Sequence, residues 1–401
     1  MNIWKFHSAG SLVFGRECVG QLGEIVSQLR AKRVFLVTDA TLVRVGVVER
    51  VVHPLVTAGH SVEVSALGVP EPPIEVVCNA IDAARAFYPD VVIGVGGGSN
   101  MDVAKLVAAV LTHGGDPLDY TGEFRVPGPT VPLICVPTTA GTGSEVSPAA
   151  VFTDTTRQMK VSCLSHYLHP AVAVVDPLLT VGCPKPVTAD SGIDALTHAI
   201  EAYTAADNVE FQRRPGGTSI YQGKNPIADA MASECITLVG KYLRRAVADG
   251  NDLDARDGMA LAATLGGLAF SNAGVALVHA MEYPVGGAVH VSHGAGNGLL
   301  LPHVMRFNLQ QRSREIAMIG GMLGVASFSG GVERNAEATI REIEQLRIDI
   351  GIPTTLRQLG VTEAMLPEFA QKAFAISRLM RVNPRMPTSP SEILDVYRAA
   401  F

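Results

Sequence analysis

The order of apolar and polar positions divides the chain into two halves with different periodicities. Up to about residue 185, short apolar runs alternate with longer segments of helical spacing, which is typical of a parallel sheet flanked by helices. Residues 34–37 and 91–95 are the clearest buried strands. Residues 132–137 predict another strand, and residues 74–87 predict a helix. The first half is therefore predicted to be an α/β domain with a parallel, Rossmann-like sheet.

The second half has a different pattern. From about Thr188 onward, long helical segments rich in Ala, Leu and Met continue to residue 401, which predicts an all-α domain. We place the boundary so that residues 1–185 form the α/β domain and residues 186–401 the helical one. A Gly/Pro-punctuated loop is predicted over residues 211–226, and loops of this length are often lids or binding loops. The Ser/Gly patch at 327–331 predicts a turn between helices.

Composition and charge narrow the classes of function. The net charge of −6 is spread thinly and Lys and Arg form no run, so nucleic acid is a poor partner and a small molecule a better one. No apolar window reaches the ~18 residues of a membrane span, and the first residues do not resemble a secretory leader. The six cysteines are scattered without a CxxC pair, which favours free thiols in a reducing compartment. We therefore expect a cytoplasmic protein that neither spans nor binds a membrane.

A glycine cluster follows one of the predicted strands directly. Gly96, Gly97, Gly98 and Ser99 open a segment with helical spacing. Glycines let the backbone approach a pyrophosphate closely, and the free N–H groups of a helix N-terminus favour an anion. The cluster lacks the last glycine of GxGxxG, so a tight strand–helix turn is the alternative interpretation.

Two other segments favour a dinucleotide. Asp39 ends the first strong strand, where its carboxylate would bind the adenosine ribose and repel a 2′-phosphate, favouring NAD over NADP; the alternative role is a helix N-cap. The loop after the third strong strand, residues 137–145, is rich in glycine and hydroxyl groups and suits a second face of the cofactor. Its candidate contacts are Thr138, Thr139, Thr142 and Ser144.

Four residues of the second half form a candidate metal site. Asp194 and His198 are spaced i, i+4 on one face of a helix, although such a pair alone is more often an ordinary helix pair. His279 and His293 flank a Gly-rich, hairpin-like segment at 284–288, so both rings would face the first pair. One carboxylate and three imidazoles suit iron(II) or zinc better than magnesium or calcium. We predict that His290 and His303 are not ligands.

Taken together, these motifs resemble the iron-containing (group III) alcohol dehydrogenase family nearly end to end. The resemblance implies an N-terminal domain that binds NAD, a C-terminal domain that binds metal and substrate, a cleft between them holding both groups, and a homodimer. It also implies that the cofactor is approached by Asp102, which lies in the same segment as Lys105, and by Lys160. Leu179 would line the adenine side of the cofactor. Iron is the expected metal, with zinc as the alternative.

The chain departs from this family at two places. Tyr283 stands where many members carry a histidine that is thought to relay the alcohol proton. The loop at 211–224 resembles an insertion in the hydroxyacid-oxoacid transhydrogenase branch. Its cations Arg213, Arg214 and Lys224 are candidates for binding a substrate carboxylate, with solvated loop charges as the alternative.

The sequence thus predicts a metal-dependent oxidoreductase that transfers a hydride between a primary alcohol, or a hydroxyacid, and NAD. His279 would hold the catalytic metal and Tyr283 would relay a proton, unless Tyr283 serves only packing. The first alternative is a transhydrogenase acting on 4-hydroxybutyrate and 2-oxoglutarate with a bound nicotinamide. A distant alternative is a lyase similar to dehydroquinate synthase, which needs several basic residues around a substrate phosphate that the stretch directly after His293 does not offer.

Overall fold

The computed structural model describes residues 3–157, 159–325 and 330–401, which form two compact units. One unit consists of residues 7–182. The other consists of residues 183–401 together with the N-terminal residues through Phe6. Most of the turn predicted at 327–331 lies outside the described residues.

The first unit is built on a parallel sheet, as the sequence predicts. Its six strands stand in the order β1-β9-β6-β4-β2-β3, and every neighbouring pair is parallel. The strands are β1 (Ser11–Phe14), β2 (Arg33–Val37), β3 (Ser61–Ser65), β4 (Val91–Gly96), β6 (Leu133–Pro137) and β9 (Val172–Val175). The predicted strands are therefore confirmed as its central members, β2, β4 and β6.

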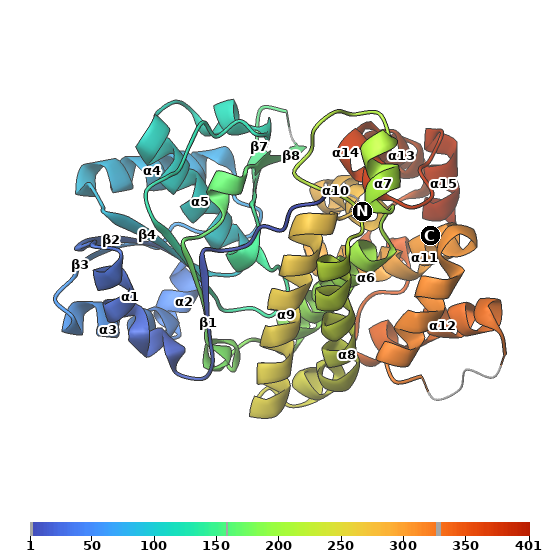
Figure 1. Cartoon of the computed structure of the whole chain (residues 1–401), viewed down its shortest axis with the longest axis horizontal. Coiled ribbons are helices and arrows are strands. Elements are labelled where there is room, and N and C mark those ends of the chain that lie inside the picture. Colours follow the sequence, from blue (N-terminus) through green and yellow to red (C-terminus); the bar gives the residue numbers. More distant parts are fainter. Residues whose placement is uncertain (1–2, 158, 326–329) are drawn as a thin grey trace. The chain divides into compact units, whose positions relative to one another are not determined.

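Helices cover both faces of this sheet, which explains why the strands are continuous apolar runs. In β2, Phe35 and Val37 pack on one face with helices α4 (Ile74–Phe87) and α5 (Gly98–His113). Val34 and Leu36 pack on the other face with α1 (Leu22–Gln28) and α3 (Val47–Thr57). Figure 1 shows these two helical layers on either side of β2 and β4. A short helix, α2 (Ala40–Arg44), follows β2.

A small second sheet, which the sequence did not predict, lies beside α5. It has the order β5-β8-β7, with an antiparallel pair formed by β7 (Ala149–Asp154) and β8 (Met159–Leu164) and a parallel neighbour β5 (Gly122–Glu123). The backbone N–H of Val151 in β7 donates to Oδ2 of Asp102 in α5 over 3.0 Å. This bond ties the small sheet to the helix that follows the glycine turn.

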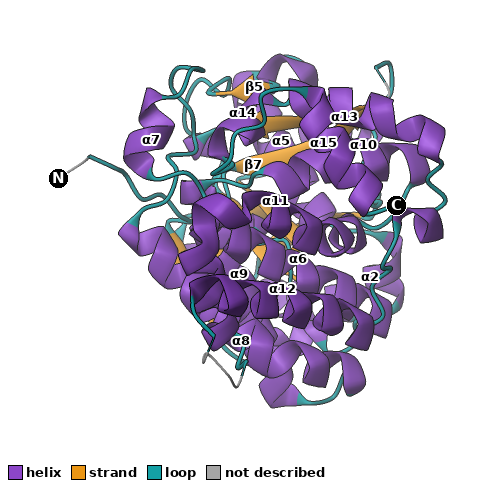
Figure 2. Ribbon diagram, turned by 90° about the vertical axis from the view of Figure 1, so that its right-hand side faces the viewer, coloured by secondary structure: helices purple, strands orange, loops and turns teal. Residues whose placement is uncertain are grey.

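The second unit is helical, as predicted. Its helices are α6 (Lys185–Thr204), α7 (Asn208–Arg213), α8 (Pro226–Ala248), α9 (Leu253–Ala273), α10 (Leu277–Val289), α11 (His293–Met322), α12 (Val332–Asp349), α13 (Leu366–Ala375), α14 (Ser377–Val382) and α15 (Pro390–Ala399). Figure 2 shows them in purple. Helix α6 packs against α8, α9 and α11, so most of its length is buried. It therefore places side chains in the interior of this unit.

Short 3-10 turns connect several elements. They are η1 (Cys18–Gln21), η2 (Pro117–Tyr120), η3 (Ser144–Val146), η4 (His166–Leu168), η5 (Pro177–Thr180), η6 (Leu356–Leu359) and η7 (Glu363–Met365).

Two local predictions were wrong. The segment 284–288, predicted to be hairpin-like, lies inside α10, where buried Val285 and Gly286 show that tertiary packing outweighs the poor helix propensity of Pro284 and the glycines. The loop predicted at 211–226 is shorter, because α7 continues to Arg213 and α8 begins at Pro226.

The described residues contain no single helix with the length and apolar character of a membrane span. Helices α9 and α10 meet these limits only as a pair, and they are bent by 106° at the break between them.

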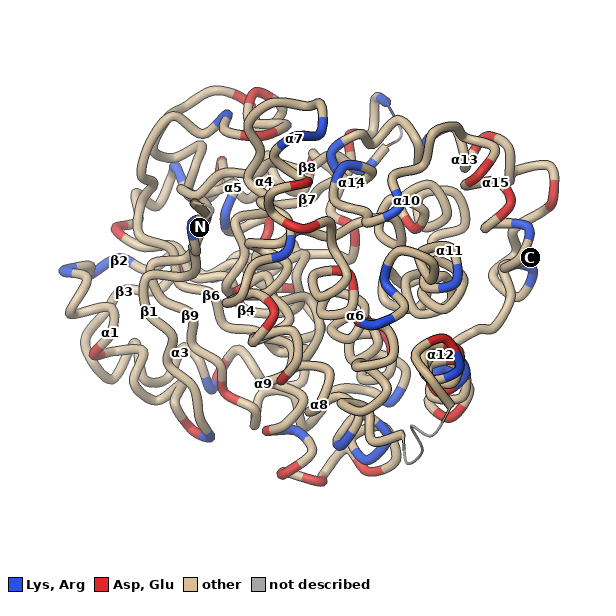
Figure 3. The backbone as a smooth tube through the Cα atoms, turned by 45° about the vertical axis from the view of Figure 1, so that its right-hand side comes forward, with Lys and Arg blue, Asp and Glu red and all other residues tan. Residues whose placement is uncertain are grey.

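Positively charged Lys and Arg and negatively charged Asp and Glu are interspersed along the backbone, and α12 carries residues of both charges (Figure 3).

Candidate metal and cofactor sites

Helix α6 supplies the first two predicted ligands from its buried middle. Asp194 and His198 are 3% and 5% exposed, and Nδ1 of His198 lies 3.9 Å from Oδ2 of Asp194. The His198 ring stacks against Phe270, with centroids 4.4 Å apart, and against His279, with centroids 4.8 Å apart. The packing of two rings therefore holds the imidazole of His198.

The N-terminal ends of α10 and α11 bring the other two ligands to the same place. Nε2 of His279 and Nε2 of His293 each lie 4.0 Å from Oδ1 of Asp194. Ligand atoms of Asp194, His198 and His279 all lie within 4.8 Å of one another. The structure thus brings together all four residues that the sequence proposed, although they come from three helices.

Glu201 fixes the orientation of His279. Its Oε2 lies 2.6 Å from Nδ1 of His279, and its two oxygens accept from the backbone N–H groups of Ala276 and Val278 at the start of α10. A carboxylate is also favoured at a helix N-terminus. Because Nδ1 carries the proton in a bond to a carboxylate, the lone pair of His279 lies on Nε2, which faces Asp194.

Glu282 holds His293 in the same way. It is fully buried, and its Oε2 contacts Nδ1 of His293. Gly296 makes room for it, since a Cβ at that position would lie 2.8 Å from Cγ of Glu282. The Nε2 lone pair of His293 is therefore also directed to the cluster.

Asn297 shows where the ligand atoms converge. Its Nδ2 lies 2.8 Å from Oδ1 of Asp194, 3.3 Å from Nε2 of His279 and 3.1 Å from Nε2 of His293. Burial would raise the pKa of Asp194, but the imidazoles of His198, His293 and His279 outweigh it and hold that pKa below its usual value. An ionised carboxylate and imidazole nitrogens are a donor set that fits a first-row divalent metal.

The sequence analysis missed Glu201, Glu282 and Asn297, which contact the proposed ligands, although each stands at helical spacing from one of those ligands. Glu201 follows His198 by three positions, Glu282 follows His279 by three, and Asn297 follows His293 by four. Each spacing places the residue near its ligand on one helix face. A polar residue three or four positions after each proposed ligand was the sequence signal that could have identified them.

Close contact between α6 and α11 leads to a stability prediction. A Cβ at Gly294 would lie 1.9 Å from the backbone oxygen of Asp190, so Gly294→Ala must push the start of α11, with His293, away from α6. We expect a loss of about 1–3 kcal/mol of unfolding free energy and weaker metal binding. Gly287→Ala is the matched control, because its Cβ would meet nothing within 4 Å and Ala favours the helix. Equal denaturation midpoints and metal affinities for the two variants would contradict this.

The glycine turn between β4 and α5 forms the candidate cofactor site of the first unit. Gly96 has φ +146°, and a Cβ there would lie 2.1 Å from Nδ2 of Asn100. Gly97 is the N-cap of α5 and offers no side chain to the first N–H groups, and the nearest atom to its Cβ position belongs to Thr139, 3.6 Å away. These features leave the helix N-terminus open to an anion, which fits a pyrophosphate.

The loop after β6 adjoins this turn. Because β4 and β6 are parallel neighbours, their carboxyl ends meet at one edge of the sheet. A Cβ at Gly98 would lie 3.0 Å from Thr142, so the two loops are in close contact; Thr138 is buried at the end of β6. The structure therefore brings together the predicted residues Gly97, Gly98, Thr139 and Thr142.

A buried ion pair supports the two loops. Nζ of Lys105, fully buried, donates to Oγ of Ser144 over 2.7 Å and lies 3.7 Å from Oδ1 of Asp102. Oγ of Ser144 donates to Asp102 over 2.8 Å. Burial raises the pKa of Asp102, and Lys105 offsets this in part. Asp102 and Ser144 thus connect α5 to the loop, while a cofactor contact by either stays a prediction.

The other predicted cofactor residues have structural partners. Asp39 is the N-cap of α2, accepting from Thr41 and Leu42, and its other oxygen accepts from Nδ2 of Asn100 over 2.8 Å. The alternative role of Asp39 is therefore present, and its ribose contact stays a prediction.

Glu71 connects Lys160 with Ser99. The ammonium of Lys160 lies 2.6 Å from Oε1 of Glu71, whose backbone N–H donates to Oγ of Ser99 over 3.3 Å. Leu179 lies in η5 and belongs to the apolar core on the α1–α3 face. Cofactor contacts of these residues stay predictions.

Two of the predicted substrate residues have partners within the chain. Arg214 donates through Nη1 to the backbone oxygens of Arg381 and Asn383, and through Nη2 to Pro384 over 2.9 Å. The ammonium of Lys224 donates to the oxygen of Tyr203 and pairs with Asp229 at 2.7 Å. Both cations thus connect segments of the chain, and their contact with a substrate carboxylate stays a prediction. Arg213 is exposed at the end of α7.

Tyr283 lies beside the metal ligands. Its ring centroid is 6.1 Å from that of His293, and burial raises its pKa above the usual range. A catalytic role for Tyr283 stays a prediction.

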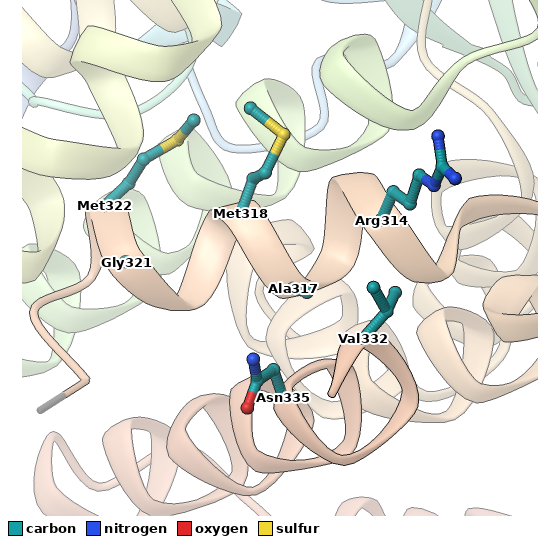
Figure 4. A pocket seen from close by; sticks show the side chains of 7 residues that line it. All are labelled: Arg314, Ala317, Met318, Gly321, Met322, Val332 and Asn335. Carbon is teal, nitrogen blue, oxygen red and sulfur yellow. The ribbon is translucent and has the colours of Figure 1, made fainter. Parts of the chain in front are cut away.

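A separate pocket of about 800 Å³ lies between α11 and α12 (Figure 4). It is lined by Arg314, Ala317, Met318, Gly321, Met322, Val332 and Asn335. None of these residues belongs to the metal cluster or the glycine turn.

The chain combines a candidate ligand set of buried Asp194, His198 and His279 and partly exposed His293 with an open glycine turn on a parallel sheet, and this combination is typical of a metal-dependent oxidoreductase. The family described as iron-containing alcohol dehydrogenase matches residues 9–177, and its C-terminal part matches residues 219–401. The chain belongs to this family.

Three similar proteins match this chain over nearly its whole length. Long-chain-alcohol dehydrogenase 1 of Geobacillus thermodenitrificans is 41% identical, over 96% of this chain and 94% of that protein. NAD-dependent methanol dehydrogenase of Bacillus methanolicus is 36% identical over 94% of each chain. The crystal structure of a 1,3-propanediol oxidoreductase covers 100% of both chains with a TM-score of 0.93 at 36% identity.

Proposed function

We propose that this protein is an NAD-dependent alcohol dehydrogenase that uses a divalent metal, iron(II) or alternatively zinc, to interconvert primary alcohols and aldehydes. The observation that carries the proposal is the convergence of the Nε2 atoms of His279 and His293 on the carboxylate of Asp194, close to Nδ2 of Asn297. Two buried carboxylates set the tautomers of both rings. That arrangement suits metal ligation.

The choice of NAD rests on the first unit. The open N-terminus of α5 would hold the pyrophosphate, and the loop with Thr139 and Thr142 would cover it. Asp39 at the end of β2 disfavours a 2′-phosphate in its vicinity. The name of the Bacillus methanolicus relative, which states NAD dependence, supports the same choice.

Each group has a definite contribution to the reaction. Asp194, His198, His279 and His293 would hold a divalent metal, which would supply the Lewis acidity that lowers the pKa of a substrate hydroxyl, and a bound NAD would supply the hydride acceptor. Glu201 and Glu282 accept hydrogen bonds from Nδ1 of His279 and His293, which leaves Nε2 of each ring for a metal. Asn297 donates to Asp194 and holds its carboxylate in place.

We propose that Tyr283 carries the proton. Its position next to His293 supports this role, because a proton relay must lie near the proposed metal ligands. It would take the role of the histidine found at this place in many relatives.

The proposal is tested with purified protein loaded with iron(II) or zinc, NAD and a series of C2–C6 alcohols. We expect NADH formation with primary alcohols, little with NADP, and a kcat at least about tenfold lower for Tyr283→Phe. No NADH with any alcohol under metal-loaded conditions would refute the proposal. Hydride exchange between 4-hydroxybutyrate and 2-oxoglutarate, without turnover of added NAD, would instead identify a transhydrogenase.

A further inference from the structure

Asn100, in the first turn of α5, connects the ends of two strands of the parallel sheet. Its side-chain Nδ2 donates over 3.1 Å to the backbone oxygen of Val95 in β4 and over 2.8 Å to Oδ2 of Asp39, which follows β2. Because both acceptors are oxygens, the NH₂ group of the amide must face them. The strands β2 and β4 are parallel neighbours, so Asn100 lies at the sheet edge where such folds bind ligands.

Two glycines enclose the amide of Asn100, which is 3% exposed. A Cβ at Gly96 would lie 2.1 Å from its Nδ2, and a Cβ at Gly68 would lie 2.0 Å from its Oδ1. The backbone N–H of Gly68 donates to the oxygen of Thr38 over 2.8 Å, so this glycine is fixed next to the end of β2. The two glycines therefore leave the amide little room to move.

The carboxylate of Asp39 is held by neutral donors. Its Oδ1 accepts from the backbone N–H groups of Thr41 over 2.8 Å and Leu42 over 3.0 Å, and its Oδ2 accepts from Asn100. Within the described residues these are the hydrogen bonds that Asp39 makes through its side chain. A carboxylate has about four acceptor positions, so one position on Oδ2 stays open for a ligand. Because the donors are neutral, the negative charge is not cancelled.

We infer that Asn100 is a positioning residue that determines the preference for NAD over NADP. It holds the carboxylate of Asp39 in the orientation that accepts a hydroxyl of the adenosine ribose and repels a 2′-phosphate. The inference rests on the proposed binding of NAD. Without the amide, the carboxylate of Asp39 is held only at Oδ1, and Oδ2 is free to move. The bond to a ribose hydroxyl then weakens, and so does the repulsion of a 2′-phosphate.

A purely structural role of Asn100 predicts a different result. Its bond to the oxygen of Val95 supports the glycine turn, and loss of that support would disturb the N-terminus of α5. NAD and NADP carry the same pyrophosphate, so a disturbed turn weakens the binding of both by the same factor. The ratio of the two dissociation constants therefore separates positioning of Asp39 from support of the turn.

The test is calorimetric titration of NAD and of NADP into metal-loaded protein, for wild type, Asn100→Leu, Asn100→Ala and Asp39→Asn. Leu branches like Asn and fills the space between Gly68 and Gly96, but it donates no hydrogen bond. We expect wild type to bind NAD more tightly, and the ratio of the NADP to the NAD dissociation constant to fall about tenfold in both Asn100 variants. Asp39→Asn, which removes the charge, should lower this ratio at least as much.

The matched control is Asn308→Ala in the helical unit. Asn308 is 5% exposed and its Nδ2 donates to Oδ1 of Asn383 over 3.0 Å, so this variant also loses a buried amide. It should lower the denaturation midpoint and leave the ratio of dissociation constants as in wild type.

The possible failures are distinguishable. A wild-type ratio in both Asn100 variants, with the preference lost in Asp39→Asn, would overturn the assignment of Asn100 alone. A wild-type ratio in Asp39→Asn as well would show that Asp39 does not select the cofactor, which also removes the basis for the role of Asn100. Wild type that binds neither dinucleotide would refute the proposed function itself.

Discussion

Replacing Asp194 with Ala is expected to remove the bound metal and to lower kcat on the order of 1,000-fold or more. The carboxylate is the only anionic member of the proposed ligand set, and His279 and His293 each place Nε2 4.0 Å from its Oδ1. Without it, only the three imidazoles of His198, His279 and His293 remain to hold the metal. Metal content measured by elemental analysis should fall in parallel with turnover.

The control for this experiment is Asp395→Ala, which removes a carboxylate that is 73% exposed on α15. It should keep full metal content and activity. Circular dichroism and the denaturation midpoint show whether each variant is folded. If Asp194→Ala kept wild-type turnover while lacking metal, the proposed role of the cluster would be wrong.

Lys105→Met is expected to destabilise the first unit by about 3–5 kcal/mol, because it leaves Asp102 buried without its cationic partner. Lys105 is fully buried and donates to Ser144 and to the oxygen of Ala149 over 2.6 Å. Asp102 in turn accepts from Ser144 and Val151. Loss of this centre should loosen the loop after β6 and weaken NAD binding, measured by calorimetry.

The pH dependence of this variant has a definite sign. Burial already raises the pKa of Asp102, and removal of Lys105 should raise it further. The folded state then binds more protons than the unfolded state, so stability falls as pH rises from the unfolded pKa to the folded one. Chemical denaturation should therefore show a smaller loss at pH 5 than at pH 8.

The double variant Lys105→Met with Asp102→Asn separates the charge from the packing. Because it removes both charges, it should recover part of the stability lost in Lys105→Met. A loss below about 1 kcal/mol in the single variant, with no recovery in the double one, would show that the pair contributes little.

The central strands could be predicted because they are buried on both faces. Residues 34–37, 91–95 and 132–137 are uninterrupted apolar runs, and such runs arise when helices cover the sheet from either side. The hairpin of β7 and β8 was missed because its strands alternate in burial and carry polar residues, so neither is a continuous apolar run. Residues 284–288 were misassigned because Pro and Gly report local propensity, whereas burial of α10 decides its structure.

The cluster of proposed ligands could be predicted because its residue types are typical metal donors and Asp194 and His198 have helical spacing. Asp194 and His198 share a helix face, and His279 and His293 stand at two helix N-termini. The substrate cations could not be resolved from the sequence, because charge alone does not show whether an arginine faces solvent, a ligand or the backbone. Arg214 binds three backbone oxygens of residues 381–384, more than 160 positions away in the chain, and only the tertiary structure shows this.

The measurement that tests the central claim most directly is a metal titration of the chelator-treated wild-type protein. Alcohol oxidation with NAD is followed as iron(II) or zinc is added back. We predict that the treated protein is inactive, that activity rises linearly, and that it reaches its maximum at one metal ion per chain, with Asp194→Ala gaining nothing. Full activity in protein without metal would contradict the account.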